Sequence, residues 1–542
     1  WGNTSDGVRG GGAREPMRLW PPLPHALEHD LPPLARITSL RREELPLADG
    51  EAAFAIAHSE GHHGHAVLVS PDVATCDNCL ADMRDPANRR YRYPFTNCTD
   101  CGPRYTITHS IPYDRATTSM SCFPLCPDCA AEYNDPLDRR FHAQPNACPV
   151  CGPKVWLASA PEGAPRISGP ELAEGQHAIE RTAAALRAGN IVAVKGLGGF
   201  HLVCDATSAE AVALLRERKR RPHKSLAIMV PDLETARRVA CVSDAEAAVL
   251  SSSERPIVVL ASRGVLPPAI APDVDSIGVM LPYTPLQHLL LHDFAKASGC
   301  AERSSQREAE GSRAATAVPM LVMTSGNIHD EPIVIDDEDA YEKLFAVADA
   351  FLGHDRAIRA RYDDSVVRVI EAGSAGEAVQ FIRRARGYAP LPLAMPAKAR
   401  EGEDVSRETS VREQGCSIFA TGPEQKNTFA LTRDAEAFVS QHIGDLENAE
   451  TYDAWFQAKD RYETLFEIEP DRIACDLHPE YLTSKWAHEQ SLPVTEVQHH
   501  HAHVVSVMAE HGLAGPVCGI AFDGTGYGMD GAIWAGKCCS PT

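Results

Sequence analysis

Eight of the seventeen cysteines follow a spacing that constrains the fold more than any other feature of the sequence. The pairs CDNC at 76–79 and CPDC at 126–129 are each followed, after eighteen residues, by a second pair, CTDC at 98–101 and CPVC at 148–151. The flanking segments repeat too, as DPANRRYRYPFTNC and DPLDRRFHAQPNAC. A set C-x2-C-x18-C-x2-C supplies four thiolates to a tetrahedral structural zinc site. We therefore predict a tandem zinc-finger module over residues 70–155 that holds two structural Zn²⁺ ions, with the ligands Cys76, Cys79, Cys98, Cys101, Cys126, Cys129, Cys148 and Cys151.

Length and composition indicate a globular protein of several domains. At 542 residues, 44% of them hydrophobic and 23% charged, the chain is long enough for roughly three to four domains with separate cores. The formal net charge of -22 disfavours nucleic acid as a partner, because phosphates repel an acidic surface. No apolar run reaches about 18 residues, and WGNTSDGVRG lacks the apolar core of a signal peptide, so no membrane association is expected. These features predict a cytoplasmic protein with reduced cysteines.

The pattern over residues 171–390 predicts one α/β domain. An amphipathic helix, AIERTAAALRAGN, precedes IVAVKGLGGFHLVCDA, which predicts a strand, a glycine-rich turn and a second strand. Such a turn lets backbone N–H groups approach an anion closely. The basic run RERKRRPHK follows, and in so acidic a chain it suggests an anionic ligand, with a solvated helix end as the alternative. Polar residues stand at the ends of later strands, where open α/β sheets bind ligands: Arg255, Ser325 and Asn327.

A further domain is expected at 414–542, after a Pro- and charge-rich linker at 391–413. Its segment VQHHHAHVV places His499 and His503 four residues apart, so on a helix both rings share one face, as two ligands to one ion require. Two ligands do not complete a site, and the rest must come from elsewhere in the chain. A His-rich surface turn is the alternative.

Several motifs together resemble a known family. The segment KGLGGFHLVCDA, the K-x-R of Lys219 and Arg221 and the S-x-N of Ser325 and Asn327 resemble the YrdC-like domain, and the duplicated zinc knuckles narrow the resemblance to the HypF family. The likeness covers nearly the whole chain and includes, in order, FHAQPNACPVCGP, RYDDSVVR, FIRRARGYAP, KNTFAL, SQHIGDLEN, CDLHPEY, VQHHHAHVV and FDGTGYGMDGAIW. It implies a multidomain α/β (α+β) fold, made of the C-terminal part of an acylphosphatase-like domain (1–60), the zinc-finger module (70–155), a YrdC-like nucleotide-binding domain (171–390), the linker (391–413) and the first part of an actin-like ATPase (ASKHA) domain (414–542).

The resemblance implies an ATP-dependent carbamoyltransferase of NiFe-hydrogenase maturation. In the family, carbamoyl phosphate yields carbamate, ATP activates the carbamate as carbamoyl adenylate, and the carbamoyl group passes to the C-terminal cysteine of a HypE partner for synthesis of the cyanide ligand. The residues that match catalytic positions are Asn3, Lys219 and Arg221. Those that match nucleotide and substrate contacts are Lys195, Gly198, Gly199, His201, Lys219, Arg221, Lys224, Arg255, Thr324, Ser325, Asn327, Asp523, Gly524, Thr525 and Gly526.

The resemblance also implies bound metals. A Mg²⁺ ion is expected with the nucleotide, with Asp363 or Asp364 as a possible ligand, and Fe or Zn is expected at His499 and His503. The residues Asp523–Gly528 match a glycine-rich phosphate-binding turn of actin-like ATPases.

The chain departs from the family pattern in three places. The N-terminal loop that carries the phosphate-binding arginine of an acylphosphatase is absent, so residues 1–60 are expected to be inactive alone. The family continues beyond CCSPT with a second lobe and a later aspartate that joins the two histidines. The segment Ser298–Val318 has few large apolar residues and is expected to be a disordered loop.

Two alternative functions stay open at this point. A synthase of threonylcarbamoyl adenylate for tRNA modification shares the K-x-R and S-x-N pattern, although the duplicated zinc knuckles disfavour it. An inactive zinc-binding fragment or adaptor would keep the zinc ions and bind no nucleotide.

Overall fold

The structure is a computed structural model, which describes residues 2–4, 7–9, 57–60, 68–159, 171–297, 318–328, 331–371, 373, 376–395, 416–513 and 515–539. Most of the segment 1–60, most of the linker and all but the last residue of the loop expected at 298–318 lie outside the described residues. Among the N-terminal residues, β1 (Gly2–Thr4) pairs antiparallel with β2 (Gly7–Arg9) and parallel with β3 (Ala57–Glu60).

The zinc-finger module contains short helices and tight turns. Helices α2 (Asp77–Arg84) and α3 (Pro127–Asn134) each begin directly after the first cysteine of a C-x2-C pair, so Cys76 and Cys126 are their N-caps. Three 3₁₀ turns connect the two halves: η1 (Tyr105–Ile107), η2 (Arg115–Thr117) and η3 (Ser119–Cys122). With so little regular structure, the module depends on its metal ligands to hold its loops together.

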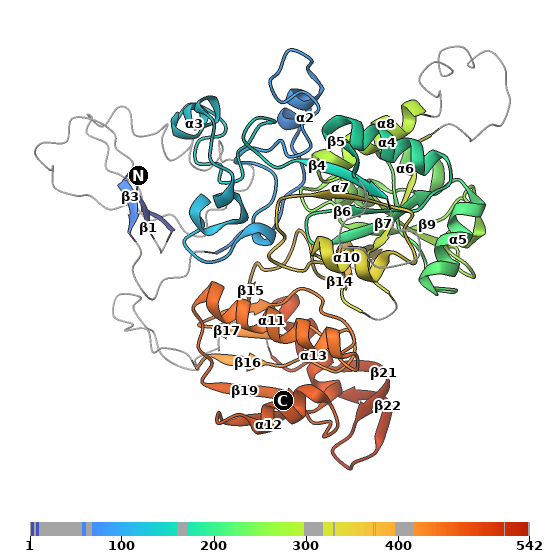
Figure 1. The fold of residues 1–542 in the computed structure, drawn as a ribbon. Helices are drawn as coiled ribbons and strands as arrows, with labels where there is room; N and C mark the ends of the chain where they lie inside the picture. The colour runs from blue at the N-terminus through green and yellow to red at the C-terminus, as the bar shows by residue number, and fades with distance from the viewer. Residues whose placement is uncertain are drawn as a thin grey trace, which may run out of the picture.

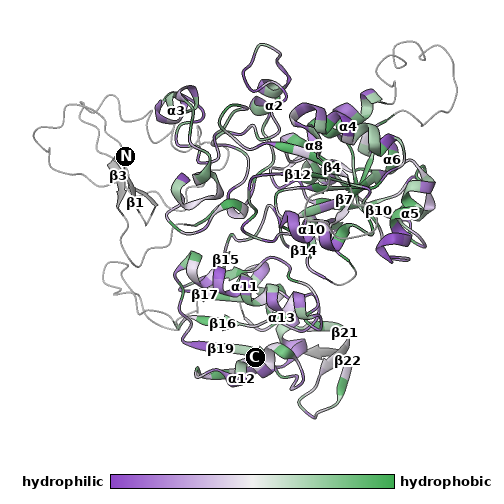
Figure 2. Ribbon diagram, in the orientation of Figure 1, coloured by the Kyte–Doolittle hydropathy of each residue, from purple (hydrophilic) through white to green (hydrophobic). Residues whose placement is uncertain are grey.

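The body of the molecule is a mixed sheet of eleven strands, in the order β14-β13-β9-β10-β8-β11-β7-β6-β12-β4-β5. In Figure 2 the strands of this body carry the hydrophobic colour, in keeping with their burial. The strands are β4 (Val155–Ser159), β5 (Glu171–Glu174), β6 (Val192–Lys195), β7 (Phe200–Asp205), β8 (Ile228–Met229), β9 (Ile257–Ala261), β10 (Ser276–Met280), β11 (Leu321–Ser325), β12 (Ala350–His354), β13 (Val366–Glu371) and β14 (Glu377–Arg383).

Helices cover both faces of this sheet and make a body of three layers (Figure 1). One core cluster joins the sheet to α5 (Ala209–Lys219), α6 (Leu233–Val239), α7 (Asp244–Ser251) and α10 (Asp337–Leu344), with η4 (Pro268–Ile270) at its border. The second cluster joins the opposite face to α4 (Gly175–Arg187), α8 (Pro285–Ala297) and the zinc-finger module. Strand β4 starts four residues after Cys151, so the second finger runs directly into the sheet.

The C-terminal domain has a six-stranded sheet in the order β15-β18-β17-β16-β19-β20, and a separate hairpin. Strand β15 lies near the start of the expected linker and pairs with β18. The first residues of the linker therefore belong to the sheet of the C-terminal domain. A buried aromatic core that includes Phe419, Phe429, Trp455 and Tyr462 fixes α11 against the sheet. The elements are β15 (Leu393–Ala394), β16 (Ile418–Ala420), β17 (Ala430–Arg433), β18 (Glu436–Val439), α11 (Ala449–Phe466), β19 (Arg472–Asp476), α12 (Leu482–Glu489), β20 (Val494–Val497), α13 (His499–Glu510), β21 (Gly519–Tyr527) and β22 (Ile533–Cys539).

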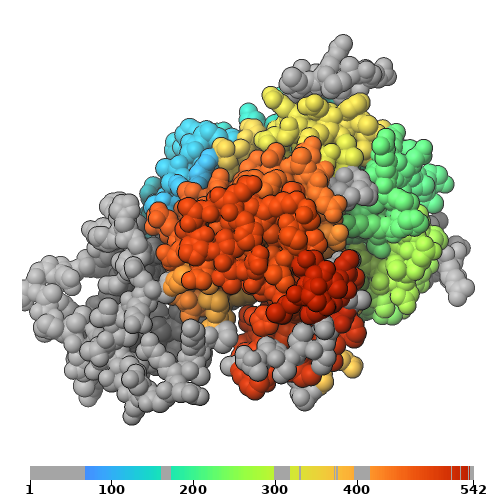
Figure 3. All heavy atoms as spheres, turned by 90° about the horizontal axis from the view of Figure 1, so that it is seen from below, coloured from blue at the N-terminus to red at the C-terminus, as the bar shows by residue number. Residues whose placement is uncertain are grey.

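The zinc-finger module ties the other two parts together. Tyr105 of η1 belongs to the core cluster of the C-terminal domain, and Arg461 of α11 donates to the Tyr105 carbonyl at 3.0 Å. On the other side, Arg92 pairs with the buried Asp293 of α8 at 2.5 Å. Seen from below, the C-terminal domain covers the centre of that face, with the body behind it (Figure 3). Among the described helices, none has the length and apolarity that crossing a membrane demands.

Candidate functional site

The eight expected cysteines gather into two separate clusters of four. Within each cluster the Sγ atoms lie within 4.8 Å of one another. The Sγ atoms of Cys76 and Cys98 are 3.6 Å apart, and those of Cys126 and Cys148 are 3.7 Å apart. A tetrahedron with Zn–S bonds of about 2.3 Å places its sulfurs about 3.8 Å apart. Both clusters therefore fit a four-thiolate zinc site that has no open coordination position, as the spacing predicts.

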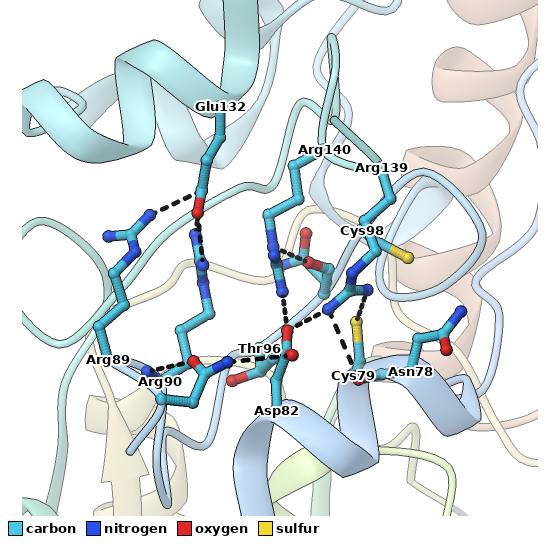
Figure 4. A network of polar contacts seen from close by, with 12 residues as sticks. Asn78, Cys79, Asp82, Arg89, Arg90, Thr96, Cys98, Glu132, Arg139 and Arg140 are labelled. Carbon is cyan, nitrogen blue, oxygen red and sulfur yellow. Dashed lines mark hydrogen bonds and ion pairs between the residues drawn. The ribbon is translucent and has the colours of Figure 1, made fainter. Parts of the chain in front are cut away.

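Each cysteine cluster receives arginines from the other half of the duplication. Figure 4 shows Arg139 beside Cys79, and Arg89 and Arg90 beside Glu132. Arg139 donates to Cys79 Sγ at 3.0 Å, and Arg89, fifty residues earlier, donates to Cys129 Sγ at 3.3 Å. The neighbouring arginines also reach the opposite half of the duplication: Arg90 forms an ion pair with Glu132 of α3, and Arg140 forms one with Asp82 of α2. The backbone takes part as well, since Arg90 Nε donates to Ala147 O and Arg140 Nε donates to Asn97 O. We refer to these reciprocal contacts of Arg89, Arg90, Arg139 and Arg140 as the arginine braces.

A large cavity of about 770 Å³ lies between the body and the C-terminal domain. Its lining includes seven of the residues expected at a nucleotide site: His201, Lys219, Arg221, Lys224, Thr324, Ser325 and Asn327. Strand β7 supplies His201, the end of α5 and the turn after it supply the cations, and the end of β11 and the turn after it supply the rest. The opposite wall comes from the KNTFAL and SQHIGDLEN segments of the C-terminal domain, with Lys426, His442, Gly444 and Asp445.

Lys219 is buried and anchored by hydrogen bonds to the S-x-N segment. It is 3% exposed, and its Nζ donates to the Ser325 carbonyl, to Asn327 O at 3.0 Å and to Asn327 Oδ1 at 2.8 Å. Burial, with the nearby charge of Arg221, lowers the pKa of Lys219 well below its usual value. Ser325 Oγ donates to Asn327 Oδ1 at 2.7 Å, so the K-x-R and S-x-N motifs form one preorganised network.

Two adjacent aspartates close the cavity floor, and each holds a histidine. Asp364 accepts from His201 Nε2 at 3.0 Å and from Arg386 Nε at 2.6 Å. Asp363 contacts His442 Nδ1 of the C-terminal domain at 3.0 Å. Burial raises the pKa of each carboxyl, but cationic neighbours outweigh it and lower the pKa of Asp363 to about 2 and that of Asp364 further below its usual range. Each oxygen of Asp364 therefore already accepts a hydrogen bond from a side chain of the body.

Eight of the expected ligand-contact residues do not line the large cavity. Four of them belong to the C-terminal hairpin, namely Asp523, Gly524, Thr525 and Gly526, and the other four belong to the body. Lys195 is buried at the end of β6, where Nζ pairs with Asp337 Oδ2 at 2.8 Å, so its charge is already neutralised. Arg255 lies away from the cavity, and its carbonyl accepts from Arg386. Gly198 and Gly199 permit close packing, since a Cβ atom would stand 2.2 Å from Tyr362 Cβ at Gly198 and 2.6 Å from Ile333 Cγ1 at Gly199. The glycine turn therefore contacts the body's own chain rather than the cavity.

His499 and His503 share one face of α13, as their spacing predicts, and Asp523 of β21 lies beside them. Asp523 Oδ2 is 2.8 Å from His499 Nε2 and 3.7 Å from His503 Nε2. Asp476, in the CDLHPEY segment, contacts His499 Nδ1 at 2.5 Å and leaves Nε2 to face the other two groups. Two imidazoles and a carboxylate fit a zinc or iron ion with open positions. We call His499, His503 and Asp523 the histidine-aspartate cluster.

This arrangement differs from the expectation for the glycine-rich segment. Residues Asp523, Gly524, Thr525 and Gly526 lie within strand β21, which pairs with β22 with an irregularity between Phe522 and Gly526, and not in a phosphate-binding turn. Gly526 packs on the buried His500, whose ring a Cβ atom would meet at 2.2 Å. Asp523 therefore supplies a carboxylate to the histidine pair from within the described residues. Asn3 lies in β1 opposite Val8, and its side chain is outside the described residues.

Sequence reasoning did not identify the residues that orient these groups. His442 and Asp476 stand in segments that resemble the family, and the arginine braces stand in the duplicated flanks of the cysteine sets. Their partners lie 79, 23 and about 40 to 60 residues away in sequence. The sequence does contain a signal for the braces. The pair Arg-Arg occurs at 89–90 and again at 139–140, at the same sequence distance before the second C-x2-C pair of each cysteine set.

Comparison with known proteins matches three family descriptions to the chain. They are "HypF finger" at residues 75–108 and 125–158, "Telomere recombination", which covers Sua5, YciO and YrdC proteins, at 184–385, and "HypF Kae1-like domain" at 413–510. Carbamoyltransferase HypF2 of Cupriavidus necator is 47% identical over 519 residues, which are 94% of this chain. The chain belongs to the HypF family. A more distant HypF relative, the probable carbamoyltransferase HypF of Methanocaldococcus jannaschii, is 36% identical over 94% of the chain.

Solved HypF structures agree with the fold. Full-length HypF in a phosphate- and nucleotide-bound form superposes with a TM-score of 0.82 at 41% identity, over 96% of this chain and 62% of that one. HypF of T. kodakarensis gives a TM-score of 0.80 at 37% identity, over 96% of this chain and 61% of that one. This chain spans about 60% of the length of the curated HypF relatives it matches. The expected multidomain α/β architecture with zinc fingers, a YrdC-like domain and a Kae1-like domain is confirmed, and the two cysteine clusters fit the zinc fingers of the HypF family.

Proposed function

We propose that this chain performs the carbamoyl-activating chemistry of the HypF family. In this proposal, carbamate derived from carbamoyl phosphate reacts with ATP in the large cavity to give carbamoyl adenylate and pyrophosphate. The carbamoyl group then passes to the C-terminal cysteine of a HypE-like partner. The observation that carries the proposal is the single cavity of about 770 Å³ that joins the Lys219 network to the wall formed by the C-terminal domain.

The cavity residues suit the adenylation step. A carbamate oxygen attacks the α-phosphorus of ATP, the bond to the β-phosphate oxygen breaks, and pyrophosphate leaves with the negative charge. Arg221 and Lys224 can offset charge on the phosphates, while Lys219 fixes the Ser325 and Asn327 backbone and amide groups in place. A Mg²⁺ ion bound with the nucleotide would supply further charge neutralisation.

The position of the cavity suits the transfer step. Carbamate and its adenylate decompose in water, so an enclosed path from activation to transfer prevents loss of the intermediate. His442, Asp445 and Thr451 of the C-terminal domain border the same cavity as Arg221. The histidine-aspartate cluster would hold Zn or Fe, whose open positions can polarise a carbonyl oxygen.

ATP–pyrophosphate exchange tests this assignment against the related synthase of threonylcarbamoyl adenylate. The purified, zinc-loaded chain is supplied with ATP, labelled pyrophosphate and either freshly dissolved ammonium carbamate or threonine with bicarbonate. We expect exchange with carbamate, and threonine should not increase the rate over bicarbonate alone. Exchange that requires threonine would support the synthase, and zinc-loaded protein that binds no nucleotide would support an adaptor.

A further inference from the structure

A second, smaller cavity lies beside the large one, between the body and the C-terminal domain. Its volume is about 60 Å³, and its lining shares Ile333, Asp363 and His442 with the large cavity. The contact between Asp363 and His442 at 3.0 Å stands at this border. The small cavity is therefore next to the proposed activation site without being part of it.

The lining of the small cavity is strongly positive. Three arginines border it, Arg359 and Arg361 from the body and Arg461 from α11, against the single carboxylate of Asp363. That carboxylate is already engaged by His442 and by Arg383 at 3.3 Å. The arginines are held by the surrounding fold, since the Arg359 N–H donates to Thr106 O at 2.7 Å and Arg461 Nη2 donates to Tyr105 O at 3.0 Å.

Two of these guanidinium groups have unmet hydrogen-bonding capacity. In the part of the chain that the structure describes, Nε of Arg361 and Nε of Arg461 are buried and have no hydrogen-bond partner. Burial lowers the pKa of Arg361, although the charges of Asp336, Asp339 and Asp363 act in the opposite direction. A buried donor without a partner is costly, and native proteins satisfy it with another residue, a water or an ion.

The size of the cavity selects the ligand class. Liquid water occupies about 30 Å³ per molecule, so 60 Å³ admits an ion of a few heavy atoms and excludes a nucleotide. A guanidinium group binds a carboxylate through two parallel hydrogen bonds in one plane, which favours a planar oxyanion. We propose that the small cavity is a binding site for a small planar oxyanion with a carboxylate-type head, of the size of bicarbonate or carbamate. The anion site is inferred from the cavity alone. Its assignment to carbamate that awaits activation rests on the proposed function.

A ¹³C NMR experiment on the zinc-loaded chain tests the site. In ammonium bicarbonate at alkaline pH, bicarbonate and carbamate coexist and give separate resonances, so the broadening of each line reports binding of that anion. We expect at least one line to broaden with the native protein, with an affinity about tenfold lower in Arg361→Gln, which loses a charge-assisted contact. Gln457→Glu, which adds a negative charge at the exposed edge of the cavity, should weaken binding without touching the core.

Two further variants separate this site from others. Arg368→Gln, on the exposed face of β13, is the control and should bind as the native chain does. Arg221→Gln changes the large cavity and should keep the broadening that depends on Arg361, so a failed activation assay and a failed anion site are distinguishable. Broadening of neither line, or equal broadening in the native chain and in both Arg361→Gln and Gln457→Glu, would overturn the proposal and leave water as the partner of these arginines.

Discussion

At the scale of single residues, the histidine-aspartate cluster depends on two carboxylates that are remote in sequence. Asp523 faces both histidine rings, and Asp476 holds His499 Nδ1, which fixes the ring so that Nε2 is the ligand atom. We predict that Asp523→Ala abolishes metal binding here and that Asp476→Asn weakens it by about 10 to 100-fold. Metal content after equilibration with Zn²⁺ and gel filtration should fall by one ion per chain and leave the two cysteine-bound ions.

The control for this prediction is Asp530→Asn, in the same hairpin, where the side chain accepts from Trp534 and not from the histidines. Its metal content should equal that of the native chain. A third ion that persists in Asp523→Ala would show that Asp523 is not a ligand.

Asp363 gives a prediction about pH and stability. Its folded-state pKa is about 2, below the usual 3.8, because Arg383 and His442 stabilise the carboxylate despite its burial. A lowered pKa contributes stability that is fully present above 3.8 and is lost as the pH falls toward 2, and a shift of this size is worth on the order of 2 kcal/mol. Urea unfolding should therefore show Asp363→Asn less stable than the native chain at pH 6, with a smaller difference at pH 3. A difference that does not change between these pH values would refute this role.

Residue identities predicted chemistry well where the spacing itself defined the geometry. The cysteine ligands and the histidine pair follow from fixed intervals within one helix or one knuckle. The ion pair of Lys195 could not be predicted from the sequence, because its partner Asp337 is 142 residues away and only the fold brings the two side chains together. Asp523 was assigned to a turn because glycines follow it, but the segment lies within β21, where an irregularity between Phe522 and Gly526 leaves Asp523 beside the histidines of α13.

At the scale of elements, the zinc-finger module is one unit rather than two knuckles in series. The arginine braces carry a cation from each half to a thiolate of the other, where it offsets the negative charge of a four-cysteine zinc site. We predict that Arg139→Gln speeds release of one of the two zinc ions to a chelator by about tenfold, and that Arg89→Gln does the same for the other ion.

The control is Arg84→Gln, at the exposed end of α2, which should release both ions at the native rate. A double variant of Arg89 and Arg139 should release both ions quickly. If neither single variant differs from Arg84→Gln, the contacts to Cys79 and Cys129 have no effect on metal retention.

The order of elements followed from the sequence more readily than their borders. Apolar periodicity indicated α4, β6 and β7 because each buries a continuous face. It did not indicate that β4 and β5 extend the body's sheet toward the zinc-finger module, or that β15 joins the C-terminal sheet. These short edge strands are defined by pairing with distant partners and carry little pattern of their own.

At the scale of the whole molecule, the large cavity explains why the parts are arranged as they are. Its cationic wall belongs to the body, its opposite wall belongs to the C-terminal domain, and the zinc-finger module packs against both. The Asp363–His442 contact joins the two walls at the point where the small arginine-lined cavity begins. An intermediate formed at Lys219 would therefore lie in a cavity that the C-terminal domain also borders.

Carbamate-dependent ATP–pyrophosphate exchange in two variants of neighbouring residues of α5 tests most directly whether the large cavity activates carbamate. Lys219→Met removes the ammonium group that organises Ser325 and Asn327. Arg218→Met removes the adjacent charge, which pairs with Asp349 outside the cavity. We predict an exchange rate at least about 100-fold lower in Lys219→Met and close to the native rate in Arg218→Met. Native exchange in Lys219→Met, with zinc bound and the fold intact, would contradict the claim that this cavity activates carbamate.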